Sequence, residues 1–231
     1  ERIYLNAVED GLKRLKNFNI SKIVIPIGND FFHINGITNK TPKGGNDLDV
    51  SGRLARIFET GEMAVIKAIN RCLDYGPVEL LWVPGNHDPQ TSYFLCKVIQ
   101  KHFMSDDRIS VDISPKVRKF VKWGTNLIGF THGDEEPLKN LPQIMVDSCP
   151  EWISHCKNKE WLTGHIHKKK QMDFISVDSM GSSTLRIMPS LCSIDQWHYK
   201  KGYVGNKKAM EIYTYNEDDG FISQISVHKR E

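Results

Sequence analysis

Four short polar islands follow strand-like segments of this chain, and they constrain its fold more than any other feature. The islands are Gly28-Asn29-Asp30, Gly85-Asn86-His87-Asp88, Thr131-His132-Gly133-Asp134 and Gly164-His165-Ile166-His167. The runs before the first two, residues 22–27 and 78–84, are nearly all apolar, which is typical of strands buried on both faces of a parallel or mixed sheet. Because α/β sheets collect ligands at the carboxyl ends of their strands, we expect the islands to lie close together.

The segments between the islands indicate helices and further strands in one α/β domain covering residues 1–231. Leu5, Val8, Leu12 and Leu15 have helical spacing. The apolar patterns and breakers predict helices over residues 53–75, with a kink or break at Gly61, over 92–103, and over 141–156, interrupted at Pro150. They also predict strands over 125–131 and 160–163, and antiparallel strands near Val177 and over 185–187, 209–215 and 221–227, with a hairpin turn at 218–220.

The segment of residues 34–52 is rich in Gly, Asn, Thr and Lys, and it is longer than most connections in compact domains. Two interpretations stay open, a functional lid or binding loop and a disordered insertion.

Composition excludes several classes of protein. The chain has 231 residues and a net charge of +3, which is too small to identify a polyanionic partner. Its five cysteines are scattered and form no C-x-x-C pair, so neither a disulfide framework nor a zinc ribbon is indicated. The longest apolar runs fall short of the roughly 20 residues that span a membrane. We therefore expect a soluble, cytoplasmic protein without a membrane partner. A homodimer stays open.

The residue types in the islands are those that bind divalent metals. Carboxylate, amide oxygen and imidazole groups suit hard or borderline cations that activate water. Asp30 could bridge two ions with its two oxygens, Asn86 offers a carbonyl oxygen, and His132, His165 and His167 offer ring nitrogens.

The islands resemble the motif blocks of the calcineurin-like metallophosphoesterase superfamily, over about residues 23–167. The segment from Gly28 to His33 is most similar to the double-strand-break-repair exonucleases of the SbcD type, because His33 stands three residues after Asp30, where phosphatases commonly carry Asp. The resemblance implies a four-layer α/β/β/α sandwich of two mixed sheets. It also implies two divalent metal ions, with Mn²⁺ favoured and Fe²⁺ or Zn²⁺ as alternatives.

Carried onto this chain, the resemblance makes Asp30 the bridging ligand, assigns Asn86, His132 and His165 to the second metal, and assigns His167 to the first. The superfamily's first block, Asp-x-His, has no counterpart here, so the first metal site is incomplete. The chain also opens on Glu1 and runs directly into a helical pattern, and we expect the missing block to lie upstream.

The implied activity is hydrolysis of phosphate esters by a water that two metals activate. His87 is the expected general acid, and either His33 or Asp88 is expected to orient it. DNA is the favoured substrate, and a phosphomonoester or a small phosphodiester is the alternative. A binding scaffold without activity, like the retromer subunit of the same superfamily, is the alternative from another class; the presence of His87 argues against it.

Basic and aromatic residues after the last island leave further alternatives open. Lys168, Lys169 and Lys170 could follow a nucleic-acid backbone or protect an exposed strand edge. The run from Trp197 to Lys201 could stack on a base or serve packing alone. Asp134 is either functional or part of the turn after Gly133.

Overall fold

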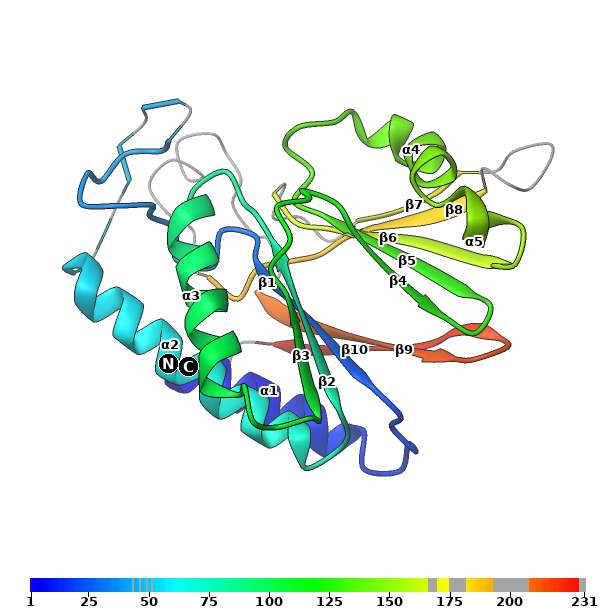
Figure 1. The fold of residues 1–231 in the computed structure, drawn as a ribbon, viewed down its shortest axis with the longest axis horizontal. Coiled ribbons are helices and arrows are strands. Elements are labelled where there is room, and N and C mark those ends of the chain that lie inside the picture. Colours follow the sequence, from blue (N-terminus) through cyan, green and yellow to red (C-terminus); the bar gives the residue numbers. More distant parts are fainter. Residues whose placement is uncertain are drawn as a thin grey trace.

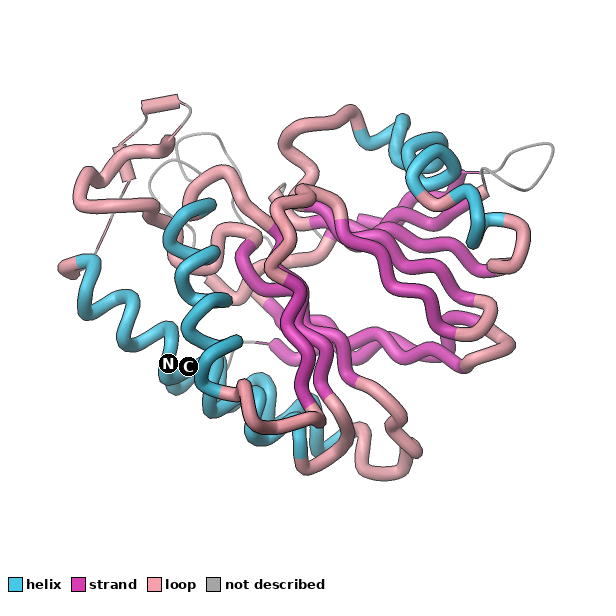
Figure 2. Tube along the Cα trace, viewed as in Figure 1, coloured by secondary structure: helices cyan, strands magenta, loops and turns pink. Residues whose placement is uncertain are grey.

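The protein is a mixed α/β structure in which helices cover several separate sheets (Figure 1). The computed structural model describes residues 1–42, 44–45, 47–48, 50, 52–165, 170–174, 182–192 and 208–228. Figure 2 shows the strands gathered in the middle of the molecule and the helices outside them. The polar islands follow the carboxyl ends of four of these strands, so the arrangement of the sheets decides which islands lie close together.

The first sheet is parallel and has three strands in the order β1-β2-β3. They are β1 (Ile23–Gly28), β2 (Val78–Val83) and β3 (Ile109–Asp112). Helices α2 (Leu54–Leu73) and α3 (Pro89–His102) lie on one side of this sheet, and α1 (Arg2–Arg14) packs beside α2 (Figure 1). Their apolar stripes pack against the strands in one core, at whose centre Ile69, Leu80 and Leu95 are fully buried. Removal of this apolar surface from water is what holds the helices on the sheet.

The second sheet is mixed and has five strands in the order β4-β5-β6-β8-β7. They are β4 (Lys119–Trp123), β5 (Asn126–Thr131), β6 (Asn158–Thr163), β7 (Lys170–Phe174) and β8 (Ser183–Ile187). The 3-10 helix η1 (Leu138–Asn140) and the helices α4 (Leu141–Ser148) and α5 (Pro150–Ile153) lie over its outer side (Figure 1). Trp161 and Leu185 are fully buried in the core beneath α4 and α5.

The third sheet is the antiparallel hairpin of β9 (Ala209–Asn216) and β10 (Gly220–His228). Met210, Ile212 and Ile225 pack against the core of α1–α3. Tyr213 and Tyr215 pack instead against a further core. The hairpin therefore contacts both of the other sheets.

That further core lies between the first two sheets. Leu81 and Val83 of β2 pack there with residues of β4, β5 and β6, namely Val121, Ile128, Phe130 and Leu162. It brings the carboxyl ends of β1 and β2 next to those of β5 and β6, although β1 ends at Gly28 and β6 at Thr163.

Most of the predicted elements are confirmed, with four differences. Helix α2 runs without a break through Gly61. A side chain at this position would collide with Phe32, since a Cβ there would lie 2.4 Å from Phe32 Cε1. Helix α3 begins at Pro89, three residues earlier than predicted. Strands β3, β4 and β7 were not predicted. The sequence favoured antiparallel strands throughout the last part of the chain. Strand β8 does pair antiparallel with β7, but it pairs in parallel with β6 on its other side. Val177 lies outside the described residues.

Two findings bear on composition. Among the described residues, no helix combines the length and the apolar character needed to cross a lipid bilayer. Four cysteines, Cys72, Cys96, Cys149 and Cys156, are buried as free thiols, and Cys192 is exposed.

Candidate metal centre

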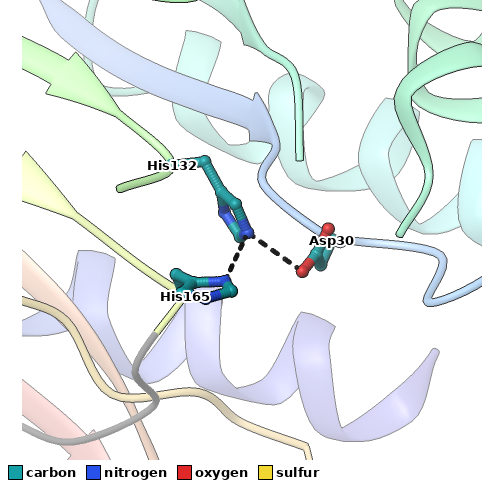
Figure 3. Close-up of side chains that lie close together, drawn as sticks. All are labelled: Asp30, His132 and His165. Carbon is teal, nitrogen blue, oxygen red and sulfur yellow. Dashed lines mark hydrogen bonds and ion pairs between the residues drawn. The ribbon is translucent and has the colours of Figure 1, made fainter. Parts of the chain in front are cut away.

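Three polar side chains from three different loops meet at the carboxyl ends of β1, β5 and β6. Asp30 follows β1, His132 follows β5 and His165 follows β6, and Figure 3 shows the His132 ring between the other two side chains. One ligand atom from each residue lies within 4.8 Å of the others. The parallel register of β5 with β6 places Thr131 opposite Thr163, which brings the two histidine loops side by side.

A fourth ligand, Asn86 from the loop after β2, joins this group. The distance from His132 Nε2 is 2.7 Å to Asn86 Oδ1, 3.1 Å to Asp30 Oδ2 and 3.1 Å to His165 Nδ1. We call these four residues the metal cluster because their side chains could together hold an ion. Metal–ligand bonds of about 2.0–2.1 Å set neighbouring ligand atoms roughly 3.0–3.4 Å apart, close to the separations found here.

Hydrogen bonds alone do not account for this convergence. A ring nitrogen carries at most one hydrogen, which can serve one acceptor, whereas His132 Nε2 faces two oxygens and a second ring nitrogen. Lone pairs directed at one point repel one another unless a cation lies among them. Two oxygens and two imidazole nitrogens form a donor set that Mn²⁺, Fe²⁺ and Zn²⁺ all accept.

The backbone around the cluster is strained. Among the described residues, four that are not glycine have positive φ: Asn29 (52°), Asp30 (66°), His33 (64°) and His165 (50°). All four lie in the loops after β1 and β6. Such conformations cost roughly 1–3 kcal/mol each and persist where the surroundings impose them, often at functional sites. Within the described residues, these conformations are thus confined to the two loops that supply Asp30 and His165.

Two glycines of the islands allow close approach of the loops. A Cβ on Gly85 would lie 2.2 Å from Asp30 Oδ1, and one on Gly164 would lie 2.6 Å from Asn29 Oδ1. No side chain fits at either distance. The glycines therefore belong to the site because they leave room for Asn29 and Asp30.

The charge state of the cluster suits a cation. Burial, the largest effect, opposes ionisation of Asp30. A protonated His132 ring, through its hydrogen bond and charge, and the backbone N–H of His87 (2.8 Å) together lower the pKa of Asp30 below its usual value. Burial, followed by the nearby charge of His132, lowers the pKa of His165. At neutral pH the site thus holds a carboxylate and a neutral His165 imidazole, both ready to bind a metal.

The predicted general acid lies beside the cluster in contact with a second histidine. His87 Nδ1 is 3.3 Å from His33 Nδ1, and the backbone N–H of His87 donates to Asp30 Oδ1. A proton on either Nδ1 would be accepted by the other ring, so the pair can hold one proton between them. Of the two residues expected to orient His87, the structure brings His33 to its ring.

Asp88 faces the interior instead. Its side chain is fully buried and its Oδ2 accepts a hydrogen bond from Phe32 N at 2.8 Å. Burial raises the pKa of Asp88 to about 7. The contact with Phe32 holds the strained loop between Asp30 and His33, so the structure gives Asp88 a loop-holding contact and no contact with the His87 ring.

The remaining predicted site residues fall outside the cluster or outside the described residues. His167, Lys168, Lys169 and the run from 197 to 201 are not among the described residues. The backbone of Lys170 begins β7, an edge strand. Asp134 is half-buried, and its negative charge partly offsets the lowering of the His165 pKa.

In the polar segment after Ile34, Asn35 Oδ1 accepts hydrogen bonds from Gln90 N and Thr91 N at the start of α3.

One contact residue was not predicted from the sequence. Asn29, the middle residue of the first island, contacts His132 Nδ1 through its side-chain oxygen. Its place between Gly28 and the proposed ligand Asp30 was the available signal, but a turn explains an Asn there equally well.

In comparisons with known proteins, no family model matches the chain and no curated protein is similar to it. A functional assignment therefore depends on the geometry of the site itself.

Proposed function

We propose that this protein is a metal-dependent hydrolase of phosphate esters. The observation that carries the proposal is the convergence of Asp30, Asn86 and His165 on His132 Nε2, with the His33–His87 pair beside them. We further propose that the fold is the four-layer sandwich of the calcineurin-like metallophosphoesterases. Three apolar cores support that layer order. The first lies between α1–α3 and the strands they cover, the second between the three-stranded and five-stranded sheets, and the third between the five-stranded sheet and α4–α5.

The cluster residues would hold one divalent cation, with Mn²⁺ as the favoured ion. Asp30 faces His132 with its Oδ2, whereas its Oδ1 accepts a hydrogen bond from His87 N. A bound cation would polarise a phosphoryl oxygen and make a water more acidic. A second ion would need further ligands, for which His167 is our candidate.

Two histidines beside the cluster would then supply the proton that the departing ester oxygen needs. His87, in contact with His33, would give a proton to the departing ester oxygen, a contribution of roughly 10² to 10⁴ in rate. His33 would share that proton and orient the His87 ring. We favour a DNA phosphodiester as substrate because of the His33 position and the polar segment after it; a phosphomonoester is the alternative.

Metal binding and turnover test the proposal separately. Calorimetric titration of the chelator-treated protein with Mn²⁺ should give a binding isotherm that is lost in Asn86→Ala. Release of nitrophenol from bis-(4-nitrophenyl) phosphate with Mn²⁺ should fall at least 100-fold in His87→Ala, while Mn²⁺ binding is retained. His155→Ala, an exposed histidine on the loop after α5, is the matched control and should change neither quantity.

Two results would contradict the proposal: no saturable binding of Mn²⁺ or Zn²⁺ by the wild-type protein, or equal turnover in wild type and His87→Ala. Comparison of single-stranded DNA with 4-nitrophenyl phosphate as substrates then decides between nuclease and phosphomonoesterase. A protein that binds metal but hydrolyses none of these esters would fit the scaffold alternative.

A further inference from the structure

Asn29 contacts the one ring nitrogen of His132 that faces away from the metal cluster. The contact joins Asn29 Oδ1 to His132 Nδ1, across 103 residues of sequence. An amide oxygen can only accept a hydrogen bond, so the hydrogen of a neutral His132 ring resides on Nδ1. The lone pair is then on Nε2, the atom that faces Asp30, Asn86 and His165. This is the tautomer that a metal ligand requires.

The position of the Asn29 side chain is set by two neighbours. Its backbone has a φ of 52° between Gly28 at 104° and Asp30 at 66°, a left-handed turn directly after β1. Its amide group also lies against the backbone of Gly164, where a Cβ would be 2.6 Å from Oδ1 and 2.8 Å from Nδ2. One amide group therefore connects the loops after β1, β5 and β6, which supply Asp30, His132 and His165.

We propose that Asn29 is a positioning residue, which fixes the tautomer and the ring orientation of His132 for the cation held by the metal cluster. The inference rests on the metal site proposed above. It adds a residue that touches neither the cation nor the ester and acts only through His132. Removal of such outer hydrogen-bond partners of metal ligands typically lowers metal affinity by about 10- to 100-fold.

Two variants separate the amide oxygen from the backbone turn. Asn29→Gly keeps the left-handed backbone without strain and removes the acceptor. Asn29→Asp keeps an acceptor oxygen at the same place. We expect the dissociation constant for Zn²⁺, measured by calorimetric titration, to rise about 10- to 100-fold in Asn29→Gly and to change less than 5-fold in Asn29→Asp. Asn39→Gly, in the exposed part of the following segment, is the matched control and should leave affinity unchanged.

A spectroscopic measurement on the wild-type protein makes the test independent of whether a variant folds. In the Zn²⁺-loaded protein labelled with ¹⁵N-histidine, long-range ¹H–¹⁵N spectra report which nitrogen of His132 carries the hydrogen. We expect a protonated Nδ1 in wild type and Asn29→Asp. A hydrogen on Nε2 in wild type, or Asn29→Gly with wild-type affinity, would overturn the inference. Wild-type protein that binds no Zn²⁺ would instead overturn the metal site, and the inference with it.

Discussion

His132 has more partners in the candidate site than any other described side chain, because both of its ring nitrogens contact residues from other loops. Nε2 faces Asp30, Asn86 and His165, and Nδ1 faces Asn29. The side chain is only 2% exposed. A buried ring with every polar atom engaged has a single orientation, and the other ligands are arranged around it. The geometry of the site therefore depends on the residues that allow the neighbouring loops to approach His132 closely.

Gly85 is one such residue. In Gly85→Ala, the new Cβ would lie 2.2 Å from Asp30 Oδ1 and 2.4 Å from Asp30 N, so Asp30 must move. We expect Mn²⁺ affinity in calorimetric titration to fall at least 10-fold, and the free energy of unfolding in urea to fall by about 1–3 kcal/mol. Gly36→Ala is the control, because no atom lies within 4 Å of its new Cβ. Equal losses in the two variants would contradict this account.

Cys96 makes stability depend on pH in the alkaline range. Burial raises the pKa of its thiol to about 12. In the unfolded chain the thiol ionises near pH 8.5–9. Between about pH 9 and pH 12 the unfolded state therefore binds fewer protons than the folded state, and the stability falls as pH rises.

Substitution isolates this contribution. Plots of the free energy of unfolding in urea against pH should fall less steeply for Cys96→Ala than for wild type, by about 1 kcal/mol per pH unit between pH 9.5 and 10.5. Cys192→Ala is the control, since this cysteine is exposed. The same slope in Cys96→Ala and wild type would show that the buried thiol is not responsible.

At the level of elements, periodicity predicted the long helices and the strands that precede the islands, because those segments bury a regular apolar face. It did not predict β3, which has four residues, or β4, in which Lys119 points inward. Lys119 is only 2% exposed and donates to Ser114 and pairs with Asp112, partners that no local pattern reveals. Within the described residues, tertiary contacts thus override the local signal in these two strands.

The site shows the same division. Residue types in the islands pointed to Asp30, Asn86, His132 and His165, which the structure brings together. The contact of Asn29 depends on a backbone turn with positive φ, and Asp88 is held inward by its hydrogen bond with Phe32 N. Residue type alone specifies neither contact. The sequence thus pointed to the side chains that converge, whereas the contacts that support them are seen only in the structure.

Helix α3 offers a test of an element that the site depends on. It begins directly after the second island, and the side chain of its N-cap residue, Asp88, makes no capping hydrogen bond. Asn35 supplies the cap from another loop, since its Oδ1 accepts from Gln90 N at 2.7 Å and Thr91 N at 3.3 Å. We expect Asn35→Ala to lower the free energy of unfolding by about 0.5–2 kcal/mol in urea titrations.

Asn35→Asp is the conservative comparison. It keeps the acceptor and places a negative charge at the amino end of the helix, so its stability should equal or exceed that of wild type. A loss in Asn35→Asp as large as in Asn35→Ala would mean that the capping bond is not what Asn35 contributes.

At the scale of the whole molecule, one buried polar network connects the five-stranded sheet to the hairpin of β9 and β10. Arg186 on β8 donates to Glu160 on β6, with Nη2 to Oε1 at 2.8 Å, and Tyr215 Oη on β9 donates to Glu160 Oε2 at 2.5 Å. The Arg186 guanidinium also lies 4.2 Å from the centre of the Phe221 ring on β10. Arg186 and Glu160 are each 7% exposed. The network therefore orients the hairpin against the sheet from which the histidine loops emerge.

Removing one member of this network should lower the stability of the fold far more than replacing the whole network with apolar side chains. Arg186→Met leaves the Glu160 carboxylate buried without its cation, and we expect a loss of about 3–5 kcal/mol in the free energy of unfolding in urea. The triple variant Arg186→Met, Glu160→Leu, Tyr215→Phe removes every charged and hydroxyl group at once, so no buried charge is left unpaired. It should recover most of the loss, because apolar replacement of a whole buried ion pair is often neutral or stabilising. If the triple variant is less stable than Arg186→Met, the network stabilises the fold by its own attraction, and the desolvation argument fails for this protein.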